Sequence, residues 1–388
     1  MAWIGGNLKM SKNLHGPQYR YKIRLQTPIH GVCIESTESG KKAKVAIKNF
    51  VTDYDGEKFF LPLEDFTHLF LNQWQKKTHL SLTHIENCVI VINKERIATV
   101  SVNCPVTSEI LSKENVEKGS LVFKDSVGDI RKIFIHGVKI PPDCGLIHLF
   151  SLNWRRGLYF DFSPLLYPDH QRNEDLSTLF ASLYAYLFYP EIFRSPPDIQ
   201  RQLFELGWFP FIRILGRDYE ALFKKAINKI PFENIENQIL GRFDAIQINK
   251  MYDSWMQKRI FVPHKNLIRK GIDEYLEGDP ISAIHILYPR IEGVIQLFDI
   301  DTKSLKLGRE EIIQAVKSKN QDRTLFLPEQ FNEFLKTNYL NPFDKKSQDI
   351  ALSRHSLAHG VVTNPNHFSK IRALQAILTL DQLSFYVD

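Results

Sequence analysis

The spacing of apolar residues changes once along the chain, and this change constrains the fold more than any other feature. Up to about residue 165, apolar and polar residues alternate in runs such as Tyr19 to Leu25, which is the two-residue period of a half-buried strand. From about residue 170, apolar residues recur every three or four positions, as in a helix. A chain of 388 residues is also too long for one ordinary core. We therefore expect an α+β protein of two or three domains.

The first predicted domain, residues 1–168, is β-rich. Further strand-like runs begin at Lys44, Cys88, Ala98, Leu121, Lys132 and Leu158. Turn-forming residues such as Asp55-Gly56 and Asn93 separate them, and this spacing favours an antiparallel sandwich or barrel. The domain carries no catalytic motif. A sensing or partner-binding module and a plain structural domain are equally consistent with it.

Residues 169–262 are predicted to form a helical linker domain. A buried helix is expected over Leu179 to Tyr189, which is too short and too polar for a membrane span, and further helices over 199–206 and 217–229. The aromatic stretch Trp208 to Phe211 separates the last two. Such residues can stack on nucleic-acid bases, but a buried core is the favoured interpretation.

A third predicted domain, residues 263–388, is an all-helical bundle. We expect a helix over Asn266 to Leu276 that ends at Gly278, and a second that begins at Asp279-Pro280 with Asp as its cap. Further helices are predicted over residues 309–318, 328–337, 347–359 and 368–386. The last has an apolar stripe that needs a partner face.

Composition and cysteine usage exclude several classes of protein. Hydrophobic residues make up 43% of the chain and charged residues 24%, so the chain can fold. The net charge of +6 permits a nucleic-acid partner without requiring one. The cysteines Cys33, Cys88, Cys104 and Cys144 form no CxxC pair, so we expect reduced core thiols and no zinc knuckle. The absence of a signal-like apolar stretch near Met1 favours a cytoplasmic protein without a membrane segment.

A basic segment lies at the entrance to the last predicted domain. It contains five Lys or Arg residues and no acid: Lys258, Arg259, Lys265, Arg269 and Lys270. Phosphate attraction could make these residues an RNA path. A solvated linker and helix face explains them equally well.

The most polar part of the predicted bundle is the stretch Ser353 to Gly360. His355 and His359 are four residues apart and so share a helix face, Arg354 precedes them, and Gly360 is expected to end the helix. A zinc site is one interpretation, with His367 as a third ligand, although Ser356 stands where a metalloprotease has Glu. A structural helix end that offsets the dipole is another. The third is acid/base chemistry on RNA, with imidazole moving a proton and Arg stabilising the phosphate.

The stretch from Arg354 to His359 resembles the signature of HEPN ribonucleases, an Arg and a His separated by four to six residues. In that family a polar residue commonly follows the Arg, and here it is His355. The ending Leu357 to Gly360 also resembles many bacterial members, and residues 275–293, with Glu292, resemble the early helices of these domains. The resemblance covers about 120 residues.

This resemblance implies a metal-independent, cofactor-free endoribonuclease that acts as a homodimer through its C-terminal bundle. Its members cut RNA, including tRNA, through attack by the adjacent 2′-hydroxyl, and many are toxins in bacterial anti-phage defence and abortive infection. A β-rich domain followed by a HEPN domain is similar to ApeA-type anti-phage proteins, which implies a phage-derived or antitoxin protein as partner.

The resemblance also assigns roles. His359 is the expected general base or acid, Arg354 holds the scissile phosphate, and His355 orients the pair or the RNA. Glu292 either positions Arg354 or is an ordinary surface carboxylate, and the basic segment is expected to hold the RNA backbone. The alternative is a non-catalytic HEPN-like adaptor that recognises a protein partner through its β domain.

Overall fold

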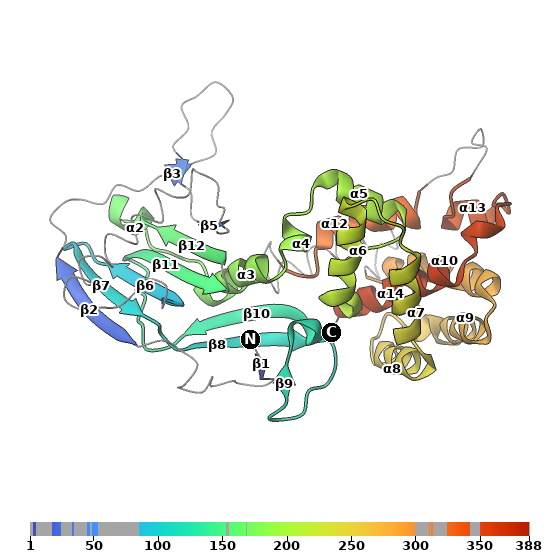
Figure 1. Ribbon diagram of the computed structural model, residues 1–388, viewed down its shortest axis with the longest axis horizontal. Coiled ribbons are helices and arrows are strands. Elements are labelled where there is room, and N and C mark those ends of the chain that lie inside the picture. The colour runs from blue at the N-terminus through green and yellow to red at the C-terminus, as the bar shows by residue number, and fades with distance from the viewer. Residues whose placement is uncertain are drawn as a thin grey trace, which may run out of the picture. The chain divides into compact units, whose positions relative to one another are not determined.

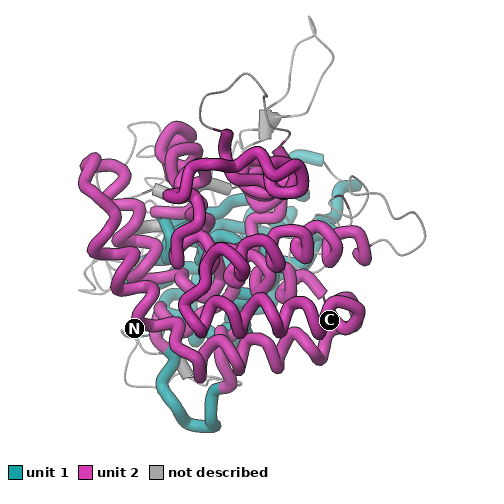
Figure 2. The backbone as a smooth tube through the Cα atoms, turned by 90° about the vertical axis from the view of Figure 1, so that its right-hand side faces the viewer, with its two compact units in different colours: residues 1–111, 116–122, 130–190 teal, residues 112–115, 123–129, 191–388 magenta. Residues whose placement is uncertain are grey.

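The computed structural model describes residues 3–4, 18–24, 33–34, 45–46, 49–52, 85–152, 155–167, 169–298, 310, 312, 324–341 and 350–387. Strands occupy the first part of the chain and helices the rest (Figure 1), so the predicted α+β class is confirmed. The chain forms two compact units (Figure 2). Unit 1 comprises residues 1–111, 116–122 and 130–190, and unit 2 comprises residues 112–115, 123–129 and 191–388. The domain boundaries expected at residues 168 and 262 stay predictions.

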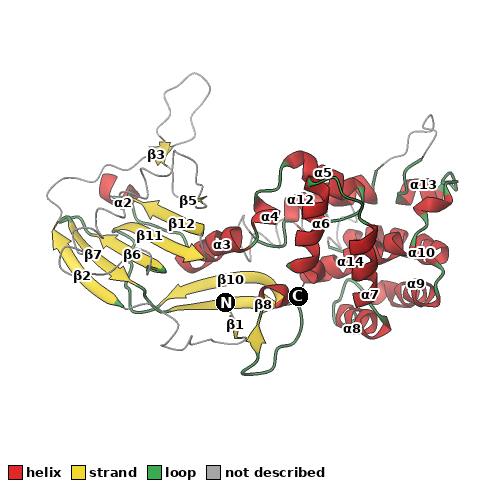
Figure 3. Ribbon diagram, in the orientation of Figure 1, coloured by secondary structure: helices red, strands yellow, loops and turns green. Residues whose placement is uncertain are grey.

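Unit 1 is built on a six-stranded sheet in which every neighbouring pair is antiparallel (Figure 3). Its strands, in spatial order, are β2 (Tyr19–Arg24), β7 (Ile97–Val102), β6 (Asn87–Ile92), β11 (Gly145–Leu152), β12 (Arg155–Asp161) and β5 (Asn49–Thr52). The strands predicted from Tyr19, Cys88, Ala98 and Leu158 are therefore neighbours or near neighbours in one sheet. The predicted turn at Asn93 closes the hairpin between β6 and β7, because its side-chain Oδ1 accepts from the Ile97 amide at 2.8 Å.

Three smaller strand pairs accompany the sheet in the described residues. They are β1 (Trp3–Ile4) with β9 (Leu121–Val122), β3 (Cys33–Ile34) with β4 (Val45–Ala46), and β8 (Val106–Ser112) with β10 (Val127–Ile135). The predicted runs at Lys44, Leu121 and Lys132 fall within or beside β4, β9 and β10. The turn expected at Asp55-Gly56 lies outside the described residues.

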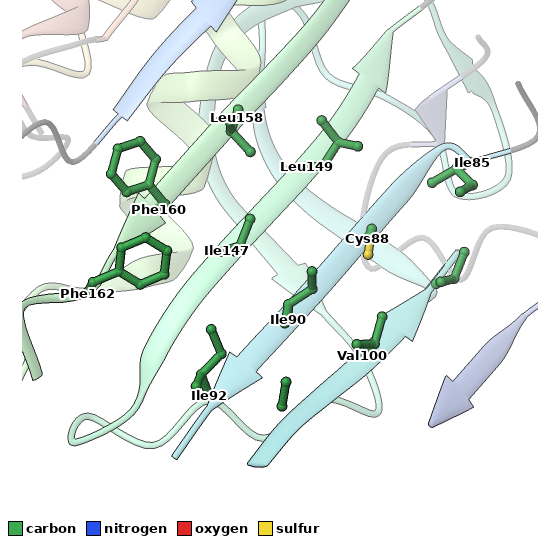
Figure 4. Packing of buried hydrophobic residues seen from close by; sticks show 12 residues of the cluster. Ile85, Cys88, Ile90, Ile92, Val100, Ile147, Leu149, Leu158, Phe160 and Phe162 are labelled. Atoms are coloured by element: carbon green, nitrogen blue, oxygen red, sulfur yellow. The ribbon is translucent and has the colours of Figure 1, made fainter. Parts of the chain in front are cut away.

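One face of the sheet carries the main apolar core of unit 1 (Figure 4). Alternate residues of the central strands contribute to it, and Leu165 of the short helix α2 (Ser163–Leu166) packs against it. The buried cluster consists of Ile85, Cys88, Ile90, Ile92, Ala98, Val100, Val102, Ile147, Leu149, Leu158, Phe160 and Phe162. Because every residue of β6 is buried, both faces of the sheet are covered there.

The opposite face is covered by helix α3 (Leu176–Phe188), which begins at the capping residue Asp175. Aromatic rings fill the space between helix and sheet: the His148 ring lies 4.6 Å from that of Phe180, and the Phe150 ring lies 4.5 Å from that of Tyr184. Any Cβ at Gly157 would collide with the Phe150 ring, so glycine is required for this packing.

Unit 2 contains the helices of the rest of the chain. They are α4 (Pro190–Phe193, which begins at the unit boundary), α5 (Pro197–Glu205), α6 (Arg217–Ile227), α7 (Glu233–Arg242), α8 (Ala245–Trp255), α9 (Lys265–Glu277), α10 (Pro280–Gln296), α12 (Pro328–Asn338), α13 (Arg354–Ala358) and α14 (Lys370–Phe385). Short 3₁₀ helices include η3 (Ile212–Ile214), η4 (Val262–His264) and η5 (Pro365–His367).

Helix α14 is the centre of unit 2. It packs against α7, α8, α9 and α10, and every residue from Ala373 to Ser384 is buried. The helix is therefore buried around its whole circumference over these residues, and not only along the predicted apolar stripe. The buried polar side chains are satisfied internally: Asp381 accepts from Arg213 and Trp255, both at 2.9 Å, and Gln382 accepts from the Ile212 amide at 2.9 Å.

Two short segments beside strands β8 and β10 belong to unit 2 rather than unit 1. Asp129 accepts from the Thr324 hydroxyl at 2.6 Å and from the Leu325 amide at 3.1 Å, which fixes the turn before α12. Arg213 donates to the Lys113 carbonyl at 2.6 Å. These contacts are between residues about 100 or more positions apart, which no local pattern predicts.

Most helix predictions are confirmed within a few residues, with one clear correction. The helix expected over 347–359 is not helical at residues 350–353, and α13 begins only at Arg354. The reason is local, because Ser353 has extended backbone angles and caps the helix. Most of the helix predicted over 309–318 lies outside the described residues.

Candidate functional site

Helices α9 and α10 form a tight hairpin that positions Glu292. Gly278 adopts the left-handed conformation (φ +89°) that ends α9, and the Asp279 carboxylate caps α10 by accepting from the Ser282 amide at 3.0 Å. The helices approach closely because Gly271 has no side chain; a Cβ there would lie 2.7 Å from Leu287 Cδ2. Both predicted helix ends are confirmed. Glu292 lies near the C-terminal end of α10.

Helix α13 is five residues long and capped at both ends. The Ser353 hydroxyl accepts from the Ser356 amide at 3.2 Å, and the Ser356 hydroxyl accepts from the Ser353 amide at 2.8 Å, which completes a capping box. Gly360 has a φ of +61°, so the predicted C-terminal glycine is confirmed. Arg354 is the first residue of the helix, whereas the helix expected over 347–359 would place it in the last two turns.

The start of α13 is held against the buried end of α12. The Arg354 amide donates to the Tyr339 carbonyl at 3.0 Å. Tyr339 is itself fixed, because its hydroxyl lies 2.9 Å from that of Thr379 on α14 and its ring lies 4.7 Å from that of Tyr288 on α10. Three helices thus determine where the Arg354 backbone lies.

An ion pair joins helix α10 to helix α13. Arg354 Nε lies 2.6 Å from Glu292 Oε2, with 36% of the Arg354 side chain and 12% of the Glu292 side chain exposed. The angle at this contact is not that of a hydrogen bond, and Oε2 has no other hydrogen-bond partner in the described chain. The second oxygen, Oε1, accepts from Gln296 at 3.4 Å. Glu292 therefore holds the guanidinium of Arg354 mainly by charge.

The two histidines differ in their exposure and in their contacts. His355 Nδ1 is 3.4 Å from Arg354 Nη1, at the long limit of a hydrogen bond, and His355 is half-buried. His359 is the exposed C-terminal cap of α13, and its amide donates to the His355 carbonyl at 3.2 Å. The predicted i, i+4 relation of the two histidines is therefore confirmed.

The arrangement leaves part of the Arg354 guanidinium available. Guanidinium carries five N–H donors. Within the described part of the chain, Nε faces Glu292, Nη1 faces His355, and Nη2 has no hydrogen-bond or ion-pair partner. A half-exposed cation held at one edge can bind an anionic oxygen, and the neighbouring His355 imidazole can move a proton beside it.

The residues of the predicted basic segment lie on several elements, and some of their charged groups have partners whereas others do not. Arg269 donates to Asp273 at 2.9 Å and to Asn249 at 2.7 Å, and its guanidinium lies over the Tyr252 ring. Lys270 pairs with Glu274, and Lys258 donates to the Val387 carbonyl at 3.0 Å. Arg259 and Lys265 are exposed and pair with no carboxylate among the residues described.

Other sequence features are structural. Trp208, Phe209 and Phe211 are buried with 0–1% exposure, which confirms the core interpretation of the aromatic stretch. Cys88, Cys104 and Cys144 are free and buried, and burial raises the pKa of each thiol. In the described ranges, no group of three His, Cys, Asp or Glu could hold a metal ion, and no helix there has the length and apolarity to span a bilayer.

The sequence patterns did not identify three residues on or next to the helices that carry the ion pair. Gln296 lies four residues after Glu292, so helical periodicity alone could have placed it beside that carboxylate. His285, seven residues before Glu292, shares its helix face for the same reason. Tyr339 could not have been found, because its contact with Arg354 is through the backbone.

Comparisons with known proteins add no relative. No protein-family model matches the chain, and no curated protein and no solved structure matches it either.

Proposed function

We propose that the chain is a metal-independent HEPN endoribonuclease, a toxin of bacterial anti-phage defence. The observation that carries this proposal is the 2.6 Å ion pair between Glu292 and Arg354. Two segments 62 residues apart were assigned to one site by their resemblance to the family, and their charged side chains are in contact. The helices from α9 to α14 would then form a HEPN bundle, and the sheet of unit 1 would belong to an antiparallel sandwich or barrel.

The proposed reaction is cleavage by an internal nucleophile. A base removes the proton of a ribose 2′-hydroxyl, the 2′-oxygen attacks the adjacent phosphorus, and the bond from phosphorus to the 5′-oxygen breaks. An acid protonates the leaving 5′-oxygen, which leaves a 2′,3′-cyclic phosphate and a 5′-hydroxyl. Arg354 stabilises the charge on the phosphate oxygens, and His359, exposed at the end of α13, moves a proton as base or acid.

The remaining residues have supporting roles in this proposal. Glu292 holds the Nε edge of Arg354 so that its other donors face the phosphate, and His355 limits the movement of Nη1. Arg259 and Lys265, with Lys258, Arg269 and Lys270 nearby, attract the RNA backbone. The functional form would be a cytoplasmic homodimer through the C-terminal helices, with a phage-derived protein or an antitoxin bound by unit 1.

Incubation of the purified chain with total tRNA and ribosomal RNA in EDTA tests this function. We expect discrete products that end in a cyclic phosphate. Arg354→Ala should lower the rate about 10²- to 10³-fold and His359→Ala about 10²- to 10⁴-fold. His170→Ala in unit 1 is the matched control and should cleave as the wild type does.

Expression in growing bacteria, with and without phage infection, provides a second test that includes a cellular trigger. The wild type should stop growth under at least one condition, and Arg354→Ala and His359→Ala should not. A wild type that is harmless in both conditions and cleaves no RNA would contradict the enzyme and favour the non-catalytic adaptor.

A further inference from the structure

A histidine on the same helix as Glu292 stacks against an aromatic ring from another part of the chain. The ring centroids of His285, on α10, and Phe368, just before α14, are 5.3 Å apart, and the ring planes differ by only 4°. His285 is exposed and Phe368 is half-buried. One face of the imidazole is therefore covered by the Phe368 ring, while the residue as a whole remains open to solvent.

The ring pair lies along the same stripe of α10 as the ion pair. Seven residues separate His285 from Glu292, which at 3.6 residues per turn places them on one helix face, about 10 Å apart along the axis. The short segment from Gly360 to Phe368 also returns the chain from the end of α13 to α10. The Arg354 ion pair and the ring pair thus lie at two ends of one stripe of α10.

The hydrogen bond of His285 determines which of its nitrogens is available. Nδ1 lies 2.8 Å from the Ile281 carbonyl oxygen, four residues earlier in α10. A carbonyl oxygen can only accept, so Nδ1 carries a hydrogen and donates it. In the neutral ring Nε2 is then an acceptor, on the edge of the imidazole away from this bond. It can accept from an amino or imino group.

We propose that His285 and Phe368 form a subsite for one unstacked base of a single-stranded RNA bound at Arg354. This inference rests on the proposed function. The base stacks on the open face of His285, and its hydrogen-bonding edge is read by Nε2. Aromatic and histidine rings are the usual platforms for splayed RNA bases, stacking tolerates different bases, and each base carries an N–H group on its Watson–Crick edge that Nε2 can accept. The residues would thus hold the base next to the cut.

Binding of short fluorescent RNAs tests the subsite without requiring cleavage. The probes are decamers of rA, rC and rU and an abasic decamer with the same phosphates, and the protein is the full chain carrying His359→Ala. Adding His285→Ala should weaken binding of the base-containing decamers about 5- to 50-fold and leave the abasic decamer unchanged. His285→Phe keeps a ring but no acceptor, so it should recover the part of the affinity that stacking supplies. Ile281→Ala, an exposed apolar residue one turn earlier, is the matched control.

The possible results separate this inference from the proposed function. Loss confined to base-containing RNA, with recovery in His285→Phe, is the expected result. If His285→Ala binds every decamer as tightly as its His359→Ala parent does, or loses as much affinity for the abasic decamer as for the others, the subsite is overturned even if the wild type cleaves RNA in EDTA. A wild type that neither cleaves nor binds RNA would overturn both. Phe368→Leu, which keeps an apolar side chain, gives an independent measure of stacking if its thermal unfolding matches that of the wild type.

Discussion

Two arginine–carboxylate pairs of this protein have the same chemistry in different surroundings. In unit 1, Arg172 Nε donates to Asp161 at 2.8 Å, and its other nitrogens donate to the carbonyls of Cys144 and Pro141; the two charged side chains are 2% and 1% exposed. In unit 2, the Arg354 side chain is 36% exposed and Glu292 holds only one edge of it. The first guanidinium has all three nitrogens engaged, whereas the second keeps a donor for another molecule.

This difference distinguishes an ion pair that only stabilises the fold from one that can also bind a ligand. A buried arginine whose nitrogens are all engaged can only hold the fold together, because any ligand would have to displace an internal bond. An arginine fixed at one edge by charge keeps its position and still has donors to offer. Fixed position with open donors is what transition-state stabilisation requires.

The largest expected effect follows from the buried pair. Arg172→Met should lower the free energy of unfolding by about 3–5 kcal/mol, because it leaves the Asp161 carboxylate buried without its charge partner. Urea denaturation measures this. Arg354→Met, the same substitution in the exposed pair, should cost only about 1 kcal/mol or less. Equal losses in the two variants would contradict the distinction between the pairs.

The next effect concerns pH and a buried histidine on the same sheet face as Asp161. Burial lowers the pKa of His148 to about 3, and a smaller effect of the Cys88 backbone raises it. The unfolded chain binds this proton below about pH 6.5 and the folded chain does not, so stability is complete above pH 6.5 and is lost as the pH falls towards 3. At pH 4.5 the loss should be about 2–3 kcal/mol.

Denaturation of wild type and His148→Phe between pH 7 and pH 4.5 isolates this contribution. The wild type should lose more stability than the variant over the interval. Asp161 does not interfere, because its pKa is lowered below the usual value and its contribution disappears only at more acidic pH. Parallel pH curves for the two proteins would mean that His148 is protonated or hydrated inside unit 1.

A smaller effect is expected at the open pair, and it should be seen in activity rather than stability. Glu292→Gln keeps the shape of the side chain and removes its charge, so Arg354 can shift and RNA cleavage should fall about 10- to 100-fold. The free energy of unfolding should change by less than about 1 kcal/mol. The exposed Glu333→Gln is the control. If stability falls as far as in Arg172→Met, Glu292 is a structural residue.

Local chemistry made much of the fold predictable. The Asp279-Pro280 cap, the glycines at 278 and 360 and the Asn93 turn fix backbone angles through their own side chains, or the lack of one, so the structure agrees with the sequence there. Strand β11 was missed because it is buried on both faces, and a run such as Gly145–Leu152 has no clear alternation. The start of α13 differs from the prediction because a helical period cannot show that Ser353 has extended backbone angles and caps the helix.

The candidate site was only partly predictable. Helical spacing predicted that His355 and His359 share a helix face. It could not predict the contact between Glu292 and Arg354, because these residues lie on helices separated by α12 and by residues outside the described chain. That pairing came from resemblance. A count of basic residues also could not show that Arg269 and Lys270 form ion pairs. Their partners, Asp273 and Glu274, lie four positions after them, where helical spacing places them on the same face.

The smallest expected effect extends the comparison to the basic segment. Arg259→Ala and Lys265→Ala should each weaken RNA binding about two- to threefold and reduce the dependence of log affinity on log salt by about one unit, because each removes an exposed charge that can meet a phosphate. Arg269→Ala should change the salt dependence less, since its guanidinium already faces Asp273 and lies over Tyr252. Fluorescence anisotropy at several salt concentrations measures both quantities. If all three substitutions act equally, an ion pair within α9 does not remove a cation from RNA binding, and the rule drawn from Arg172 and Arg354 holds only for buried partners.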